Sequence, residues 1–322
     1  MILAAAGWQR AFAAERELRQ QGATWEATAL ALKEEFAKRS GRAAMTLIEL
    51  LVAITIAAIL AGLVLAAYRS AQEGGRSWAT RATIAKLNNI IAARYESYIT
   101  RRVPIRIPAG TSPAQAARMR LDAIRDLMRM EMPDARSDVM NGPIVFTWGS
   151  VSEPALHRLY AANPPTAAYD AAQCLYKVVS MGSPAEMEQF HQQEIGAVDG
   201  KPVFVDGWGN PIMWFRWAPG FVAPDSEIQS GDSVKDHDPF DSRKIEPDAF
   251  RLIPLIYSGG GAHGVDGKPS YGLDTRAPTA ADIAAGRDYY VYAGNPYNLG
   301  LAMPIPGSSY QGNIDNHHAD RQ

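Results

Sequence analysis

The sequence predicts an α+β fold, in which one long N-terminal helix packs on a small antiparallel sheet and a helical region is inserted between them. Two observations carry this prediction. Residues 45–68 form an apolar run that continues, without a proline, into an amphipathic helical pattern over residues 69–100. Strand patterns rich in aromatic and β-branched residues appear only after residue 200, separated by Gly, Pro and Asp.

Residues 1–44 precede the apolar run, and we expect them to be a cytoplasmic leader. Trp8 to Arg39 contains no proline and is rich in helix-forming residues. No apolar core of a secretory signal peptide occurs here. Lys38, Arg39 and Arg42 form a basic cluster just before the apolar run, which favours a cytoplasmic N-terminus.

Residues 45–68 are predicted to span a membrane. From Leu50 to Ala67 no residue is charged, and as a helix the segment covers about 36 Å, against a hydrocarbon core of about 30 Å. Glu49 lies just inside its N-terminal end, where a lone carboxylate is costly in lipid. Hydropathy alone leaves two readings open: a functional acid, or a plain anchor whose acid reaches the membrane interface.

The run Ala44-Met45-Thr46-Leu47-Ile48-Glu49-Leu50-Leu51-Val52 resembles the processing site of type IV pilins and type II secretion pseudopilins. That pattern is a small residue, then Phe or Met, then Thr-Leu-Ile/Val-Glu-Leu-Leu-Val before an apolar helix. The resemblance implies cleavage between Ala44 and Met45, N-methylation of Met45 and a role for Glu49 in assembly. The family strongly prefers Gly before the cut, where this chain has Ala44.

The same resemblance implies partners and a location. The partners are prepilin peptidase, other pilin or pseudopilin subunits, and the lipid of the inner membrane. The chain would cross that membrane once, with a cytoplasmic N-terminus and a periplasmic C-terminal domain, and would later enter an extracytoplasmic filament.

Residues 69–100 form the amphipathic half of the long helix. Gly74-Gly75 allows a kink or fray near its start. Apolar residues then recur at three- and four-residue spacing and predict a face covered by a folded domain: Ile84, Leu87, Ile90, Ile91, Tyr95 and Tyr98.

Residues 101–200 are predicted to be an inserted helical region that serves packing. Ser112 and Pro113 are typical of a helix start, with the proline in the first turn. Further helices are predicted over residues 154–162, over residues 166–181, and from Ser183, where Glu186 three residues later gives a capping box.

Residues 201–322 are predicted to be a β-rich C-terminal region. Residues 202–205 and 211–217 read as strands around the turn Asp206-Gly207-Trp208-Gly209-Asn210, and residues 252–257 and 289–292 as two more. This turn, followed by Pro211, is similar to one in major pseudopilins. Residues 194–221 and 313–317 look similar to a group of planctomycete pilin-like proteins. The resemblance therefore implies a pilin-like fold.

Composition and motifs indicate a protein that is not an enzyme. The net charge of −2 gives no basic tail for nucleic acid, so no nucleic-acid partner is expected. The single cysteine, Cys174, forms no intrachain disulfide and reads as a buried thiol. No cofactor is required. Major pseudopilins bind Ca²⁺ in a loop after their sheet, and Asp266 is the residue that the resemblance makes a candidate ligand.

The sequence thus favours a structural subunit of a type IV pilus or a type II secretion pseudopilus. One alternative is a signal-anchored periplasmic binding protein or adhesin, whose N-terminal motif serves insertion only. A second is a membrane-anchored metal hydrolase that uses late His and Asp residues, such as a zinc site from His263 and His317.

Overall fold

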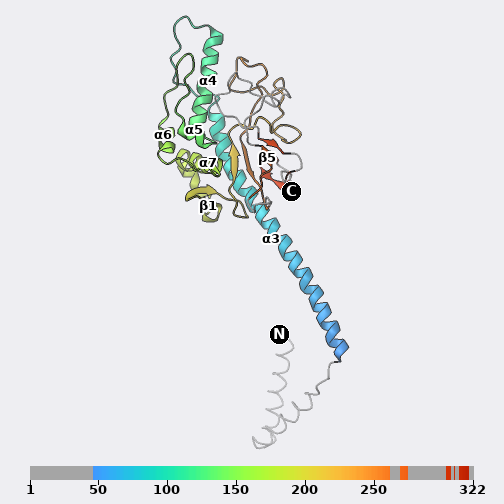
Figure 1. The fold of residues 1–322 in the computed structure, drawn as a ribbon. Coiled ribbons are helices and arrows are strands. Elements are labelled where there is room, and N and C mark those ends of the chain that lie inside the picture. The colour runs from blue at the N-terminus through green and yellow to red at the C-terminus, as the bar shows by residue number, and fades with distance from the viewer. Residues whose placement is uncertain (1–45, 262–268, 275–301, 306–307, 309–311, 319–322) are drawn as a thin grey trace, which may run out of the picture. The chain divides into compact units, whose positions relative to one another are not determined.

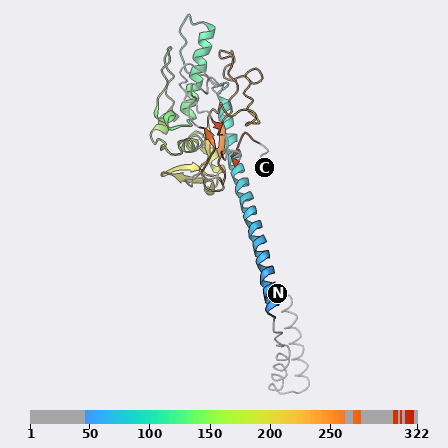
Figure 2. The same ribbon diagram turned by 45° about the vertical axis from the view of Figure 1, so that its right-hand side comes forward.

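The computed structural model describes residues 46–261, 269–274, 302–305, 308 and 312–318. The chain divides into two compact units, Met1–Tyr68 and Arg69–Gln322, and helix α3 (Leu47–Ser97) contributes to both. Figures 1 and 2 show α3 as one unbroken helix. The fold is α+β, with this long helix packed with small antiparallel sheets, as predicted.

α3 continues as regular helix through Gly74 and Gly75, so the kink or fray that this pair allows is not seen. Contacts on both sides of the pair hold the helix. The indole Nε1 of Trp208 donates to Glu73 Oε2 at 2.8 Å, and the backbone N–H of Gly207 donates to Thr80 Oγ1 at 2.9 Å. The helix ends at Ser97, before the first proline that follows it.

The C-terminal part of α3 buries the face that its spacing predicts. All six predicted apolar residues, from Ile84 to Tyr98, are buried. They share one hydrophobic core with α4 (Pro113–Glu131), α7 (Asp170–Gly182) and the strands. The side chains that fill this core include Leu121, Met128, Leu175, Val178, Phe204, Trp214 and Ile256.

The inserted region is helical, and most of its predicted helices are confirmed. α4 begins with the capping box of Ser112 and Gln115, with Pro113 in the first turn. The short helices α5 (Arg136–Met140) and α6 (Ala155–Ala161) precede α7. A β-strand begins within the region at Ile195, before residue 201.

The capping box predicted at Ser183 is wrong. Its side chain makes no cap, and the segments after it are 3₁₀-helices, η1 (Pro184–Gln189) and η2 (Gln192–Glu194). Ser183 is already the C-cap of α7, where its N–H donates to Val179 O at 2.9 Å. With φ −142° and ψ 62°, it does not have the extended backbone that an N-cap residue needs.

Charged residues fill much of the buried surface of α4, which the sequence did not reveal. Arg125 pairs with Asp238 at 2.9 Å, and Arg129 pairs with Asp126 at 2.9 Å, all four being nearly inaccessible to solvent. Burial raises the pKa of Asp126, while Arg129 opposes that shift. Buried pairs of this kind are costly to break, because the remaining charge is then left without a partner.

Arg216 is fully buried and ties the end of α4 to α5. Its Nη1 donates to Asp138 Oδ2 at 2.9 Å and to Met132 O at 2.8 Å. Asp134 accepts the backbone N–H of Arg216 at 2.9 Å. Burial raises the pKa of Asp134 to about 7, although the Arg216 guanidinium acts in the opposite direction.

Arg94 of α3 holds the C-terminal ends of two other helices. Its Nη1 donates to Val178 O in the last turns of α7 at 3.0 Å, and its Nη2 donates to Glu131 O at the end of α4 at 3.1 Å. A cation at a helix C-terminus is favourable because it satisfies carbonyls that lack partners within the helix. A Cβ on Gly182 would overlap this guanidinium, so glycine makes room for it.

Within the described residues, the strands form three small antiparallel sheets. β1 (Ile195–Val198) and β2 (Lys201–Phe204) form a hairpin closed by Asp199 and Gly200, both at positive φ, the geometry of a two-residue type I′ turn. β3 (Met213–Phe215), β4 (Leu255–Ser258) and β7 (Ile314–Asp315) form a sheet in the order β3-β4-β7. β5 (Leu273–Asp274) pairs with β6 (Met303–Pro304). Residues 289–292 lie outside the described residues.

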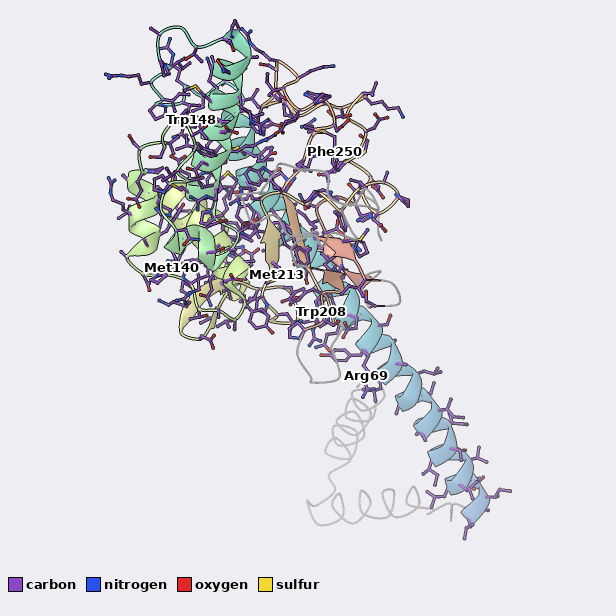
Figure 3. The ribbon with its side chains drawn as sticks, turned by 45° about the horizontal axis from the view of Figure 1, so that its top comes forward. Arg69, Met140, Trp148, Trp208, Met213 and Phe250 are labelled. Atoms are coloured by element: carbon purple, nitrogen blue, oxygen red, sulfur yellow. The ribbon has the colours of Figure 1, made fainter. Side chains whose placement is uncertain are left out.

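The turn between β2 and β3 is folded by Asp206 and docks on α3. Oδ1 of Asp206 accepts the backbone N–H groups of Trp208 and Asn210 at 2.9 and 2.8 Å, and Oδ2 accepts Ser258 Oγ at 2.5 Å. A Cβ on Gly207 would lie 2.7 Å from Cα of Arg76. Figure 3 shows Trp208 beside α3. Glycine is therefore required for the close approach of the turn to the helix.

Replacing Gly207 with Ala should destabilise the second unit by about 1–3 kcal/mol, because the turn must move away from the α3 backbone. Thermal unfolding of the full chain in detergent, followed by near-UV circular dichroism, measures this as a lower Tm. Gly142→Ala is the control, since a Cβ there meets nothing within 4 Å. Equal Tm values for the two variants would contradict the docking.

His317 is fully buried beside β4. Its Nδ1 lies 2.8 Å from Ser226 Oγ, and its Nε2 lies 3.3 Å from Pro254 O. Burial lowers the pKa of His317 to about 4. The folded state thus holds a neutral imidazole in the pH range where an unfolded chain binds a proton.

The contribution of His317 to stability should therefore fall as the pH drops from about 6.5 to about 4, because only the unfolded state takes up this proton there, with a slope of at most about 1.4 kcal/mol per pH unit. Asp134, whose pKa is raised by burial, contributes a slope of the opposite sign, and it does so in wild type and variant alike. Chemical unfolding of wild type and His317→Asn at several pH values measures the slope. The variant should lose it, and the exposed control His191→Asn should keep it. A slope that is the same in wild type and in His317→Asn excludes a contribution from this histidine.

Candidate functional site

The N-terminal part of α3 presents a large apolar surface with no cover. Every residue from Thr46 to Gly75 is exposed. Among the described residues, α3 is the one helix long and apolar enough to cross a membrane. Twelve large apolar side chains lie between Leu47 and Leu65, and leaving them in water costs on the order of 20 kcal/mol. Such a surface requires lipid or other apolar helices around it.

The one polar side chain between Leu50 and Ala67 needs no outside partner. Thr55 Oγ1 donates to Val52 O at 2.8 Å, within the same helix. A hydroxyl satisfied by its own backbone can enter lipid or a helix bundle without an unpaired donor. Between Leu50 and Ala67, α3 therefore has no side-chain donor or acceptor that requires a hydrogen bond from a neighbouring molecule.

Glu49 lies in the first turn of α3 and forms a capping box with Thr46. The backbone N–H and the Oγ1 hydroxyl of Thr46 both donate to Glu49 Oε2, at 2.9 and 3.0 Å. In return, the backbone N–H of Glu49 lies 3.3 Å from Thr46 Oγ1. Among the described residues, Oε1 of Glu49 has no hydrogen-bond partner. The carboxylate is thus held at the helix start through Oε2, and Oε1 can accept a hydrogen bond from another group.

Of the predicted site residues, only Glu49 can be placed. Ala44, Met45 and Asp266 lie outside the described residues, as does His263. Sequence reasoning assigned no role to Thr46, although the Thr-x-x-Glu spacing is itself the sequence signature of a capping box.

The described residues contain no group of three or more His, Cys, Asp or Glu side chains that could hold a metal ion. His317, named in the alternative zinc site, is instead hydrogen-bonded within the core to Ser226. Cys174 is buried, and burial raises the pKa of its thiol well above the usual value. These observations give no chemical site apart from the helix start.

Comparison with protein families matches residues 39–65 to a model described as the prokaryotic N-terminal methylation motif. This segment carries the signature of type IV pilins and pseudopilins. The match includes Ala44, Met45 and Glu49, together with most of the apolar part of α3. No curated protein and no solved structure matches the chain.

The motif supports a secreted subunit of the type IV pilin or pseudopilin type, and it indicates a structural subunit rather than an enzyme. Together with one long apolar helix, it fits a single-pass protein anchored in a membrane. It also implies processing by prepilin peptidase and assembly with other pilin subunits.

Replacing Thr46 with Val removes the hydroxyl of the capping box and should cost the first turn of α3 about 1 kcal/mol. Hydrogen exchange at the amide of Glu49, measured on the full chain in detergent, should then be about five-fold faster. Thr55→Val is the matched control, because its hydroxyl bonds only within the helix further along. Unchanged exchange in Thr46→Val would show that the box does not hold this turn.

Proposed function

We propose that this chain is a structural subunit of a type IV pilus or a type II secretion pseudopilus, cleaved between Ala44 and Met45 and assembled through the apolar part of α3. The observation that carries the proposal is the pairing of an uncovered apolar helix with a single carboxylate, Glu49, in its first turn. Before assembly the helix lies in the inner membrane, with its N-terminus on the cytoplasmic side.

Processing changes the charge at the start of this helix. Hydrolysis of the Ala44–Met45 peptide bond by prepilin peptidase releases the leader and leaves an amine on Met45. N-methylation of that amine leaves it able to carry a positive charge. The amine would precede Thr46, the residue that caps α3, so it would lie at the positive end of the helix dipole. A cation there is destabilised unless a carboxylate is close.

Glu49 can supply that carboxylate to a neighbouring subunit. Its Oε2 holds the capping box of its own helix, and its Oε1 is open to a second donor. In a stack of apolar helices both charges leave water, so each needs the other. At a separation of about 4 Å and an effective dielectric constant of about 20, two unit charges attract by about 4 kcal/mol. The pair would set the axial register, while the apolar surfaces supply most of the association energy.

Glu49→Ala should leave the protein in the membrane, because the apolar surface is unchanged, but abolish its incorporation into filaments. Losing one partner of a buried ion pair costs about 3–5 kcal/mol per subunit. Membrane fractions and sheared filaments, compared by immunoblotting, measure the two properties separately.

Two further variants sharpen this test. Glu49→Gln keeps an oxygen that can accept the Thr46 hydrogen bonds but removes the charge, and it should also fail to assemble. Thr55→Ala alters a polar group of the same helix that has its own internal partner, and it should assemble normally. Incorporation of Glu49→Gln at the wild-type level would overturn the proposed charge pair.

A further inference from the structure

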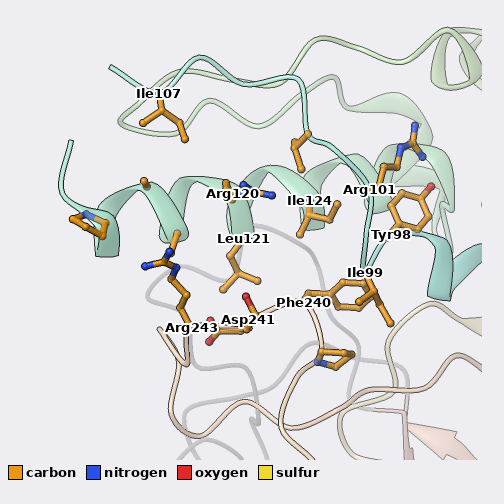
Figure 4. Close-up of a pocket in the computed structure, with 16 residues that line it drawn as sticks. Tyr98, Ile99, Arg101, Ile107, Arg120, Leu121, Ile124, Phe240, Asp241 and Arg243 are labelled. Carbon is orange, nitrogen blue, oxygen red and sulfur yellow. The ribbon is translucent and has the colours of Figure 1, made fainter. Parts of the chain in front are cut away.

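A hollow of about 480 Å³ lies in the second unit, between the segment of residues 98–107 that follows α3, the N-terminal half of α4 and the loop of residues 239–243. Figure 4 shows its lining residues. The volume lies within the range of sites that take up a side chain or a small ligand. No part of the proposed assembly through α3 uses this hollow.

The floor of the hollow is apolar and rigid. Leu121 and Ile124 of α4, Tyr98 just after α3 and Phe240 of the loop line it. Tyr98 is fixed, since its hydroxyl donates to Glu131 Oε2 at 2.6 Å, and Phe240 packs edge-on against Tyr95 at 5.2 Å between ring centroids. An apolar side chain that binds on this floor would meet side chains already held in place. Little conformational entropy of the lining would therefore be lost on binding.

Two arginines at the mouth of the hollow form no ion pair with any of the described residues. Arg120 of α4 and Arg243 of the loop both line the hollow and are exposed, and Figure 4 shows them on opposite walls. Neither has a carboxylate partner among the described residues. The other arginines within α4 are each paired with an acid: Arg118 with Asp122 and Glu246, Arg125 with Asp238 and Glu246, and Arg129 with Asp126.

The remaining charges of the lining do not neutralise these two arginines. Asp241 is buried, and its carboxylate accepts the backbone N–H groups of Ile245 and Glu246 at 2.9 and 2.7 Å. Arg101 is held by Glu131, with Nη2 to Oε1 at 2.9 Å, and lies over the ring of Tyr98. The mouth therefore keeps an excess of positive charge.

We propose that this hollow, lined by Arg120 and Arg243 above an apolar floor, is a docking site for an acidic segment of a partner protein. One apolar side chain of the segment occupies the floor formed by Leu121 and Phe240, and carboxylates on either side of it pair with the two guanidiniums. Arginine suits this role because its planar fork binds a carboxylate through two parallel hydrogen bonds. The complementarity of charge and the apolar floor together favour a peptide over a free oxyanion.

The test uses the full chain in detergent and a labelled probe, the acetylated pentapeptide Glu-Glu-Phe-Glu-Glu, whose fluorescence anisotropy reports binding. Saturable binding is expected, weakened at least ten-fold by Arg120→Glu and by Arg243→Glu. Ala116→Trp, which fills the hollow from α4, should weaken binding without changing charge. Lys235→Glu makes the same charge change at an exposed residue that does not line the hollow, and it should bind as wild type does.

Two further probes separate the contributions of charge and apolar contact. Glu-Glu-Gly-Glu-Glu should bind at least ten-fold more weakly than the phenylalanine peptide, and Lys-Lys-Phe-Lys-Lys should not bind. Circular dichroism of each variant establishes that it is folded. The proposal is overturned if Lys235→Glu weakens binding as much as Arg120→Glu, if the glycine peptide binds equally well, or if millimolar inorganic phosphate displaces the peptide completely.

Discussion

The structure depends on the fact that the apolar part of α3 cannot remain in water. From Thr46 to Gly75 every residue of the helix is exposed, while from Thr80 onward the same helix is the centre of a packed core. Lipid can cover the exposed part, and so can the corresponding helices of other subunits. This single constraint explains why α3 is so long and why one end of it carries almost no polar side chains. It also makes the lone carboxylate of Glu49 informative.

The second unit holds its part of α3 through side-chain and backbone contacts along the helix. Three groups of contacts act at successive places along the helix: the turn of Asp206 near its start, Arg94 against the ends of α4 and α7, and Tyr98 against Glu131 at its end. The ion pairs of α4 favour this packing over others, because another arrangement would leave a buried arginine without its acidic partner.

Patterns of apolar residues predicted most of the helices and the buried face of α3, since those depend on local periodicity. The polar core of α4 escaped prediction because its burial, and the pairing of Arg125 with the distant Asp238, arise only in the fold. In the sequence such charges read as a solvated surface. Strand pairing was also missed: β2 and β3 lie in different sheets, with only a Val205–Pro211 bridge between them. Asp206 folds the turn onto α3, while Asp199-Gly200 closes β1 on β2.

At the candidate site, Glu49 stood out by its charge in an apolar run, whereas Thr46 acquires its role only through the geometry of the first turn.

Mass spectrometry of the tryptic N-terminal peptide, taken from the subunit purified out of membranes and out of filaments, tests the central claim most directly. Because no Lys or Arg lies between Arg42 and Arg69, an unprocessed chain yields a peptide that begins at Ala43. The assembly account predicts a peptide in the filament fraction that begins at Met45 and carries one additional methyl group. A filament fraction whose peptide begins at Ala43 would contradict it.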